Sequence, residues 1–216
     1  MVTIACVYKQ GVWKNGTKNI EYSSKHVSWL KSMVQQHVSI PHRFVCLSDV
    51  PVDCERVALL HGWAGWWSKM ELYRPNLFEG PVFYIDLDTV VLGNIDHLLE
   101  QPQFTLLRNL SRGVGAGSGI MAWQGDQSYL YDIFKASPGK FMAEYCRHGS
   151  RWGDQGFLQE HLKEQIYWQD LFPGEIKSFY FDLKSGDPQP GTKIVCFHGL
   201  PKPWDSGKSW VPPLHP

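Results

Sequence analysis

The sequence predicts an α/β fold in which a mixed, mostly parallel sheet is flanked by helices. The first observation is that strand-like and helix-like segments alternate along the first hundred residues, which is typical of this fold class. The second is residues 82–85, an apolar run rich in β-branched and aromatic side chains, which predicts a buried central strand. The third is that polar or glycine-containing segments follow the strands, where open α/β sheets bind their ligands.

The first half of the chain yields the order strand, helix, strand, strand, helix, strand. Residues 3–8 form the first expected strand, and a polar loop containing Gly11 and Gly16 follows it. Apolar residues at helical spacing after Ser23 or Ser24 predict a helix with Val27, Leu30, Val34 and Val38 on its buried face. Strands are expected at 43–47 and 56–60, and Ser68 is expected to cap a helix over 69–74.

The second half begins with a strand at 104–107 and a glycine-rich loop at 113–119 that leads into residues 120–123. A loop with four glycines lets backbone approach a ligand closely, although it also fits a flexible turn. Helices are expected at 126–135 and 138–145. Residues 152–158 lead into another that ends at about residue 164, with Asp154 as a candidate N-cap. Late strands are expected at 176–181 and 194–197, before a proline-rich end.

Composition narrows the class of protein. The 216 residues suit one domain, and 43% hydrophobic residues suffice for a sizeable core. Lys and Arg number 21 and Asp and Glu also 21, so no basic field attracts nucleic acid or anionic membrane. We therefore expect no nucleic-acid partner. The ten Trp residues serve either as core side chains or as stacking surfaces for sugars and bases.

Cysteine usage and the start of the chain predict a cytoplasmic location. The five Cys are odd in number and form no C-x-x-C pair, which makes reduced thiols the default. The chain opens directly in a strand, and no stretch of about 18 apolar residues follows. We therefore expect neither a leader peptide nor a transmembrane segment.

Two carboxylates, Asp86 and Asp88, follow the central strand directly. Residues two apart in an extended chain point the same way, so both side chains can converge on one point. Hard oxygen donors suit Mg²⁺ or Mn²⁺, and such a cation would hold a phosphate. The alternative is that an Asp at a strand end only caps a turn.

Several short motifs follow one another within residues 3–204. They are Asp86-Leu87-Asp88 with the following 89–96, Ser118-Gly119-Ile120-Met121, Gly153-Asp154-Gln155-Gly156, and His198 with Lys202-Pro203-Trp204. Together they resemble the GT-A-fold glycosyltransferases, and within that superfamily they are most similar to the retaining family 8, the group of glycogenin and lipopolysaccharide galactosyltransferases. The resemblance implies a single glycosyltransferase domain over 1–216. Residues 1–100 would be its nucleotide-binding half, and 101–216 its sugar and acceptor half.

The resemblance also implies roles for individual residues. Asp86, Asp88 and His198 would bind Mn²⁺ or Mg²⁺, which bridges the diphosphate of a nucleotide-sugar. Lys202 would neutralise the leaving diphosphate, and Trp204 would wall the acceptor side. The remaining donor-binding residues would be Tyr8 and Lys9 at the base or ribose, Lys69, Asp154 and Gln155 at the donor sugar, and Leu87, Ser118, Gly119 and Gly199 around it. Asp154, Gln155 and Lys202 would form the catalytic set.

The expected function is metal-dependent transfer of a hexose from a nucleotide-diphospho-sugar, with UDP as the expected nucleotide, to an acceptor hydroxyl with retention. The acceptor could be a carbohydrate, a lipid-linked sugar or a protein. One alternative is a haloacid-dehalogenase-like phosphatase, whose first motif residues 86–90 satisfy, although the second acid of its later motif is missing after Asp154. Another is a non-catalytic carbohydrate-binding module, favoured by Trp63, Trp66, Trp67, Trp152 and Trp204.

Overall fold

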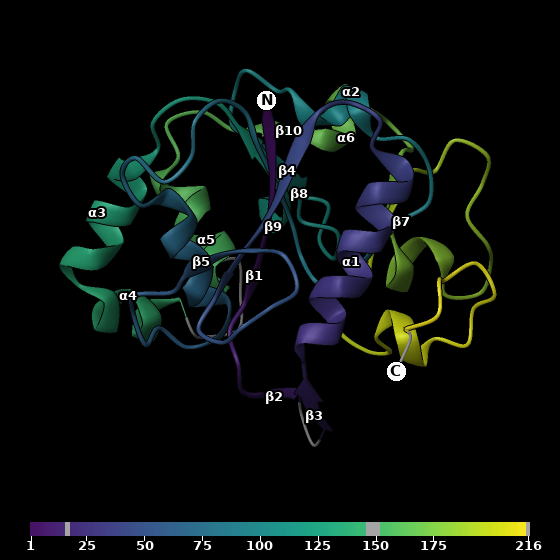
Figure 1. Cartoon of the computed structure of the whole chain (residues 1–216), viewed down its shortest axis with the longest axis horizontal. Helices are drawn as coiled ribbons and strands as arrows, with labels where there is room; N and C mark the ends of the chain where they lie inside the picture. The colour runs from purple at the N-terminus through teal and green to yellow at the C-terminus, as the bar shows by residue number, and fades with distance from the viewer. Residues whose placement is uncertain (16–17, 146–151, 215–216) are drawn as a thin grey trace.

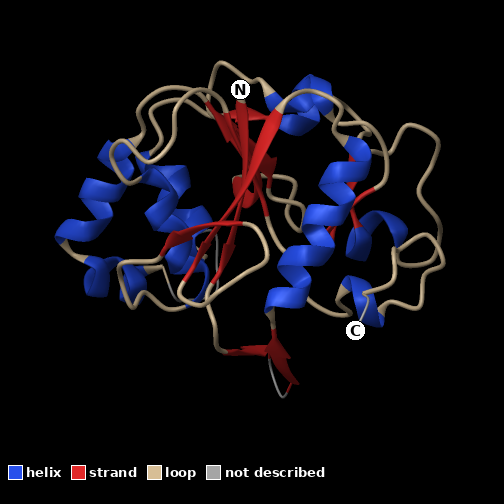
Figure 2. Ribbon diagram, in the orientation of Figure 1, coloured by secondary structure: helices blue, strands red, loops and turns tan. Residues whose placement is uncertain are grey.

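A seven-stranded mixed sheet forms the centre of the protein (Figures 1 and 2). The computed structural model describes residues 1–15, 18–145 and 152–214. Four of the six strand pairings are parallel, and only β9 runs antiparallel to its two neighbours. The predicted α/β fold with a mostly parallel sheet is therefore confirmed. In spatial order the strands are β10 (Ile166–Tyr167), β8 (Thr105–Arg108), β9 (Ala116–Trp123), β6 (Val82–Ile85), β1 (Val2–Tyr8), β4 (His42–Ser48) and β5 (Glu55–Ala58).

Helices cover both faces of this sheet. Helix α1 (Ser24–His37) and the C-terminal segment lie on one side in Figure 1, and α3 (Ser128–Ala136), α4 (Pro138–Glu144) and α5 (Gly153–His161) lie on the other. A 3₁₀ helix, η1 (Gly65–Tyr73), packs with α3 and α5. The α1 side also holds a small sheet of β11 (Ile176–Ser178), β12 (Ile194–Cys196) and β7 (Thr89–Val91). Short helices complete the chain: α2 (Asp96–Leu99), α6 (Trp168–Leu171), the π-helix η2 (Phe179–Leu183) and η3 (Pro203–Asp205).

The alternation of side chains along β1 and β6 divides the core in two. Ile4 and Phe83 belong to the apolar cluster beneath α1, whereas Ala5 and Tyr84 belong to the cluster beneath η1 and α3. This is the two-residue period of a strand buried on both faces. The pairing of β6 with β9 continues one residue further, because the amide of Asp86 donates to the carbonyl of Gly119 at 2.9 Å. The central strand therefore delivers Asp86 to the sheet edge with its backbone fixed.

Three segments differ from the sequence prediction near the sheet edge. Residues expected to form only a loop after the first strand build a hairpin, β2 (Val12–Asn15) with β3 (Lys18–Glu21), which extends away from the sheet (Figure 1). Residues 116–119, assigned to the glycine-rich loop, are part of β9. A side chain at Gly117 would place its Cβ 3.2 Å from the Cβ of Leu107, so the glycines here permit close strand pairing. Residues 179–181 form the start of η2 instead of a strand, and the Ser178 hydroxyl accepts the Phe181 amide there.

Two expected helix caps have other roles. Ser68 lies inside η1, which begins at Gly65, and its hydroxyl donates to the Gly65 carbonyl at 2.6 Å. Such a bond to a preceding carbonyl satisfies the hydroxyl within the helix rather than at its start. Asp154 is not an N-cap, because Trp152 occupies that position and Asp154 lies in the first turn of α5. A carboxylate is still favoured there by the helix dipole.

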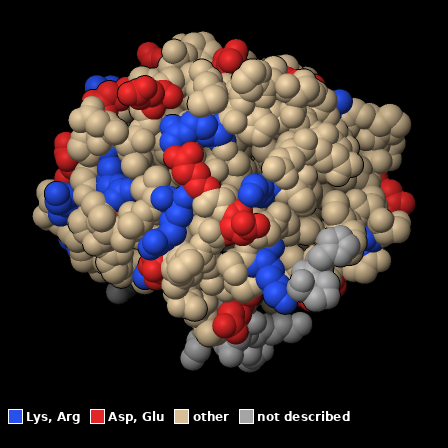
Figure 3. Space-filling view, viewed as in Figure 1, with Lys and Arg blue, Asp and Glu red and all other residues tan. Residues whose placement is uncertain are grey.

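The surface shown in Figure 3 carries acidic and basic side chains interspersed, in keeping with the balanced charge of the sequence. Within the described ranges, every helix is too short or too polar to cross a bilayer. Four cysteines have free thiols: Cys6, Cys46, Cys54 and Cys196. Cys146 lies outside the described residues.

The packing of Trp168 gives a direct test of this core. Its ring is fully buried, lies 5.9 Å from the ring of Phe83, and its Nε1 donates to the Ile120 carbonyl at 3.1 Å. We expect Trp168→Ala to lower the free energy of unfolding by about 3–5 kcal/mol, because it leaves a large cavity. The control Leu60→Ala, at a side chain 66% exposed, should change it by less than about 0.5 kcal/mol. Urea denaturation measures both, and a loss below about 1 kcal/mol at Trp168 would contradict this packing.

Candidate active site

A cavity of about 690 Å³ opens at the carboxyl ends of β1 and β6, beside the end of β8 and the start of β9. This is the edge at which α/β sheets bind ligands. Residues nearly two hundred positions apart in the sequence meet there. Of the residues singled out from the sequence, those that line the cavity are Tyr8, Lys9, Trp66, Lys69, Asp86, Leu87, Asp88, Ser118, Gly119, Trp152, Asp154, Gln155, His198, Gly199 and Lys202.

Asp86 is held by two groups on one oxygen. The Nζ of Lys69 lies 2.8 Å from Oδ1 of Asp86, and the Tyr84 hydroxyl donates to the same atom. Burial raises the pKa of Asp86 above its usual value, and Lys69 opposes this rise by favouring the carboxylate. No hydrogen bond within the described residues reaches the other oxygen, Oδ2. Asp86 therefore presents one free carboxylate oxygen.

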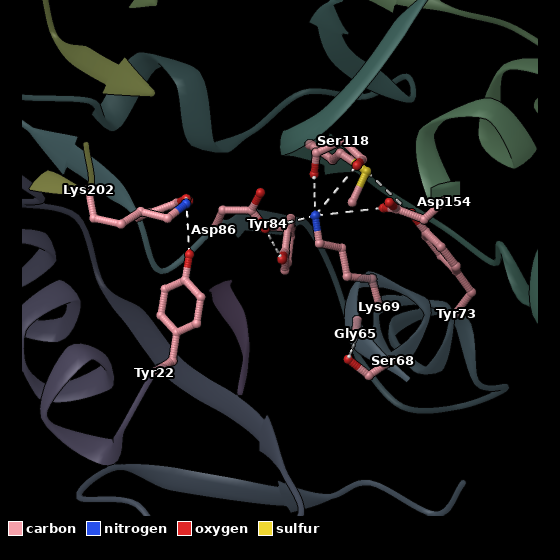
Figure 4. A network of polar contacts seen from close by, with 12 residues as sticks. Tyr22, Gly65, Ser68, Lys69, Tyr73, Tyr84, Asp86, Ser118, Asp154 and Lys202 are labelled. Atoms are coloured by element: carbon pink, nitrogen blue, oxygen red, sulfur yellow. Dashed lines mark hydrogen bonds and ion pairs between the residues drawn. The ribbon is translucent and has the colours of Figure 1, made fainter. Parts of the chain in front are cut away.

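Lys69 joins Asp86 to the opposite wall of the cavity (Figure 4). Its Nζ lies 3.6 Å from Oδ2 of Asp154 and 3.5 Å from both the carbonyl oxygen and Oγ of Ser118. Burial alone would lower the pKa of Lys69, but Asp154 and Asp86 raise it above its usual value, so the ammonium stays charged. Asp154 is 4% exposed, and its Oδ2 has no hydrogen-bond partner. The Asp154 carboxylate is therefore a buried anion whose Oδ2 faces the ammonium of Lys69.

Asp88 has a matching arrangement with Lys202. The Nζ of Lys202 lies 2.5 Å from Oδ2 of Asp88, and the Tyr22 hydroxyl donates to the same oxygen at 3.1 Å. The Phe197 amide also donates to the backbone carbonyl of Asp88 at 3.1 Å, which fixes the C-terminal segment beside the central strand. Within the described chain no hydrogen bond reaches Oδ1 of Asp88. Lys202, only 6% exposed, is thus a buried cation in the cavity wall.

The carboxylate pair fits a divalent cation by its chemistry, because Asp86 and Asp88 each keep one oxygen without a protein hydrogen bond. His198 lines the same cavity, but its Nε2 lies 2.6 Å from the Ser178 hydroxyl and its ring stacks on Phe181. Burial lowers the pKa of His198, which keeps the imidazole neutral and able to act as a ligand. In the described ranges, no three His, Cys, Asp or Glu side chains gather as a ready metal cluster. The role of His198 as third ligand therefore stays a prediction.

Two of the predicted residues face other groups. Lys9 lines the cavity, but its Nζ lies 2.5 Å from Oδ2 of Asp49. Trp204 does not line the cavity. Its ring packs instead against His26 at 4.1 Å, Tyr22 at 5.8 Å and Trp29 at 5.9 Å, measured between ring centroids. Trp204 therefore supports Tyr22 from behind, and the structure gives it no position on an acceptor-side wall.

The sequence did not indicate Tyr22 or Tyr84 as site residues. Tyr84 could have been found, because it lies two residues before Asp86 and thus on the same face of an extended chain. Tyr22 follows the β2–β3 hairpin, which the sequence predicts only as a loop. No local sequence pattern indicates its hydrogen bond to Asp88. Trp66 was placed only among the candidates for core or sugar stacking. It lines the cavity, as does Trp152.

The ion pairs of Lys69 predict how stability depends on pH. In Lys69→Met, Asp86 loses its buried cation, so its pKa, which burial already raises above the usual value near 3.8, rises further. Raised folded-state pKa values favour folding at low pH, and that contribution is lost as pH increases through them. We expect a loss of about 3 kcal/mol at pH 7 that shrinks toward pH 4.

Urea denaturation between pH 4 and pH 8 measures this loss. The matched control is Lys25→Met at an exposed lysine, which should stay near wild type throughout. A loss in Lys69→Met that is independent of pH would contradict the proposed charge pairing.

Known proteins resemble this chain both in sequence and in fold. No family model matches the chain. Glycogenin-1 of Caenorhabditis elegans is 26% identical over 149 residues, which are 63% of this chain and 32% of the relative. A putative UDP-glucuronate:xylan alpha-glucuronosyltransferase 4 of Arabidopsis thaliana is 30% identical over 141 residues, 64% of this chain and 23% of the relative. The chain thus spans about a third or less of the length of these curated relatives.

Solved structures match nearly the whole chain. The glycosyltransferase GlyE of Streptococcus pneumoniae TIGR4 superposes with a TM-score of 0.67 at 14% identity, over 97% of this chain and 62% of that one. The galactosyltransferase LgtC, solved with donor and acceptor sugar analogs, superposes with a TM-score of 0.62 at 14% identity, over 94% of this chain and 89% of that one. The chain therefore has the GT-A glycosyltransferase fold and resembles the glycogenin-like family 8.

Proposed function

We propose that the chain is a metal-dependent glycosyltransferase that moves a hexose from a nucleotide-diphospho-sugar, with UDP as the nucleotide, to an acceptor hydroxyl with retention of configuration. The observation that carries this proposal is the convergence of Asp86, Asp88, Lys69 and Lys202 in one cavity at the carboxyl edge of the central strands. The names of the relatives support it, since one is a glycogenin and another a putative UDP-glucuronate-dependent transferase.

The diphosphate would bind where Asp88 and Lys202 meet. Asp86 and Asp88, with His198, would hold Mn²⁺ or Mg²⁺, which supplies charge neutralisation for the diphosphate when bound. Lys202 is buried and fixed between Asp88 and the ring of Tyr22, with its Nζ 5.7 Å from the ring centroid. A fixed ammonium stabilises the negative charge that grows on a departing diphosphate more than it stabilises the intact donor.

The donor sugar would lie toward Lys69, Asp154 and Gln155. Asp154 forms a buried ion pair with Lys69 here, and the partly exposed Gln155 beside it has a side-chain amide that suits a sugar hydroxyl. Gly119 keeps this part of the cavity open, because a side chain there would bring its Cβ within 3.3 Å of Oδ2 of Asp86. Ser118, Gly119 and Leu87 would complete the donor contacts, with Gly199 at the phosphate end.

The base and ribose would lie at the opposite end, against Tyr8 and Lys9. The Tyr8 hydroxyl donates to the carbonyl of Tyr22 at 3.2 Å, which ties this end of the cavity to the residue that holds Asp88. The division into a nucleotide half, 1–100, and a sugar and acceptor half, 101–216, is part of the proposal, as is the cytoplasmic location. A phosphatase of the haloacid dehalogenase kind is set aside, because the fold is that of the GT-A proteins.

The first functional test concerns the cation. Asp88→Asn conserves side-chain size but removes a negative ligand, so we expect it to fold and to lose Mn²⁺-dependent cleavage of UDP-sugars by roughly 10²-fold or more. Release of UDP from a panel of UDP-hexoses, with Mn²⁺ and with EDTA, measures the effect. Asp126→Asn, at an exposed loop residue, is the control and should retain wild-type rates. Equal activity in EDTA would rule out metal dependence.

The second functional test separates chemistry from binding at Lys202. Lys202→Ala removes the fixed cation next to Asp88, and we expect kcat to fall by roughly 10²-fold or more while donor affinity changes much less. Lys202→Arg should recover only part, since the guanidinium is planar and longer. Steady-state kinetics with calorimetric titration of the donor measures both quantities, with the exposed Lys135→Ala as control. An unchanged kcat in Lys202→Ala would place the leaving-group role elsewhere.

A further inference from the structure

Two tryptophans line one end of the cavity. Trp66, from η1, and Trp152, the N-cap of α5, have ring centroids 6.3 Å apart and planes inclined by 48°. Trp66 is 41% exposed, whereas the other tryptophans of its turn, Trp63 and Trp67, are buried in the core at 7% and 5%. A large exposed aromatic face inside a cavity is available to a ligand rather than to the fold.

The Trp66 ring is held in place by the backbone of α5. Gly153 has a φ of +60°, and a Cβ built on it would lie 2.6 Å from Nε1 of Trp66. The indole therefore packs directly against the first residue of α5, where any larger residue would displace it. An aromatic surface that is already fixed costs little conformational entropy when it binds a ligand.

Polar groups accompany this surface. Asp154 and Gln155 follow Trp152 in the first turn of α5 and line the same cavity. Gln155, on the border of the proposed donor-sugar position, is partly exposed, so its side-chain amide can hydrogen-bond a hydroxyl. An apolar face beside a hydrogen-bonding amide matches a pyranose ring, which has C–H groups on its faces and hydroxyls at its edge.

The position within the cavity distinguishes this subsite from that of the nucleotide. Lys202 and Asp88 form one end of the contact network, and contacts from Asp86 through Lys69 lead to Asp154 at the other (Figure 4). Trp66 lies next to Asp154, because it packs on Gly153. The tryptophans therefore lie at the Asp154 end of the network, beside the proposed donor-sugar position and away from the proposed diphosphate.

We propose that Trp66 and Trp152 form the acceptor subsite and that the acceptor is a glycan whose pyranose ring stacks on them. This inference rests on the proposed function, because only a glycosyltransferase needs an acceptor. It identifies the acceptor as a carbohydrate rather than a bare protein or lipid hydroxyl. The acceptor-side aromatic wall expected from Trp204 is thereby supplied by two other tryptophans. Trp66 is the main binding surface because it is the more exposed of the two side chains.

The test uses maltotetraose, cellotetraose and chitotetraose as probes. Saturation-transfer NMR with the full chain should detect binding of at least one, with the strongest transfer to ring C–H protons. We expect Trp66→Ala to weaken that binding at least tenfold and Trp66→Phe to retain part of it. Tyr180→Ala removes an aromatic side chain that is 44% exposed but does not line the cavity, and it should bind like wild type.

Three outcomes would overturn the inference. The first is that the wild-type protein binds none of the three probes. The second is that Trp66→Ala binds a probe as tightly as wild type does. The third is that a bound probe leaves the rate of UDP release from UDP-sugars unchanged, since an acceptor should accelerate it. Binding needs no turnover, so the two proposals fail separately. If wild type releases no UDP from any UDP-sugar, the proposed function fails. If it does but Trp66→Ala binds normally, only the acceptor subsite fails.

Discussion

Two carboxylates at the end of a buried strand repel each other, and the site depends on the two lysines that neutralise them. Lys69 lies 2.8 Å from Asp86, and Lys202 lies 2.5 Å from Asp88. One lysine comes from η1 before the central strand and the other from the C-terminal segment. Each partly buried pair would be costly to break, because the remaining charge would stay in the cavity wall without a partner. Folding of the distant halves of the chain and assembly of the site are therefore coupled.

Under the proposed function, this arrangement would also prepare the site for an anionic ligand. With both lysines close to carboxylates, the cavity is nearly balanced in charge, and each carboxylate keeps one oxygen for a cation. A cation bound to those oxygens would weaken the hold of Asp88 on Lys202 and leave the ammonium to face a phosphate. Charge pairing before binding thus keeps the lysine in position without requiring solvent to stabilise it.

The strands and the major helices were predictable, because alternation along β1 and β6 and the helical spacing in α1 are local features of the sequence. Aspartates after the central strand were predictable for the same reason. Long-range contacts were not: no local pattern indicates that Tyr22 bonds Asp88 or that Trp204 packs behind it. The role of each glycine was not predictable either. Gly117 permits close strand pairing, and Gly153 permits close packing of Trp66.

The central claim is that Asp86, Asp88 and Lys202 together bind the diphosphate of a nucleotide through a divalent cation. Calorimetric titration of the full chain with UDP, in Mn²⁺ and in EDTA, tests it most directly because no acceptor or sugar is needed. The account predicts one UDP site per chain, with affinity at least tenfold weaker in EDTA. UDP binding of equal affinity with and without the cation, or no UDP binding at all, would contradict it.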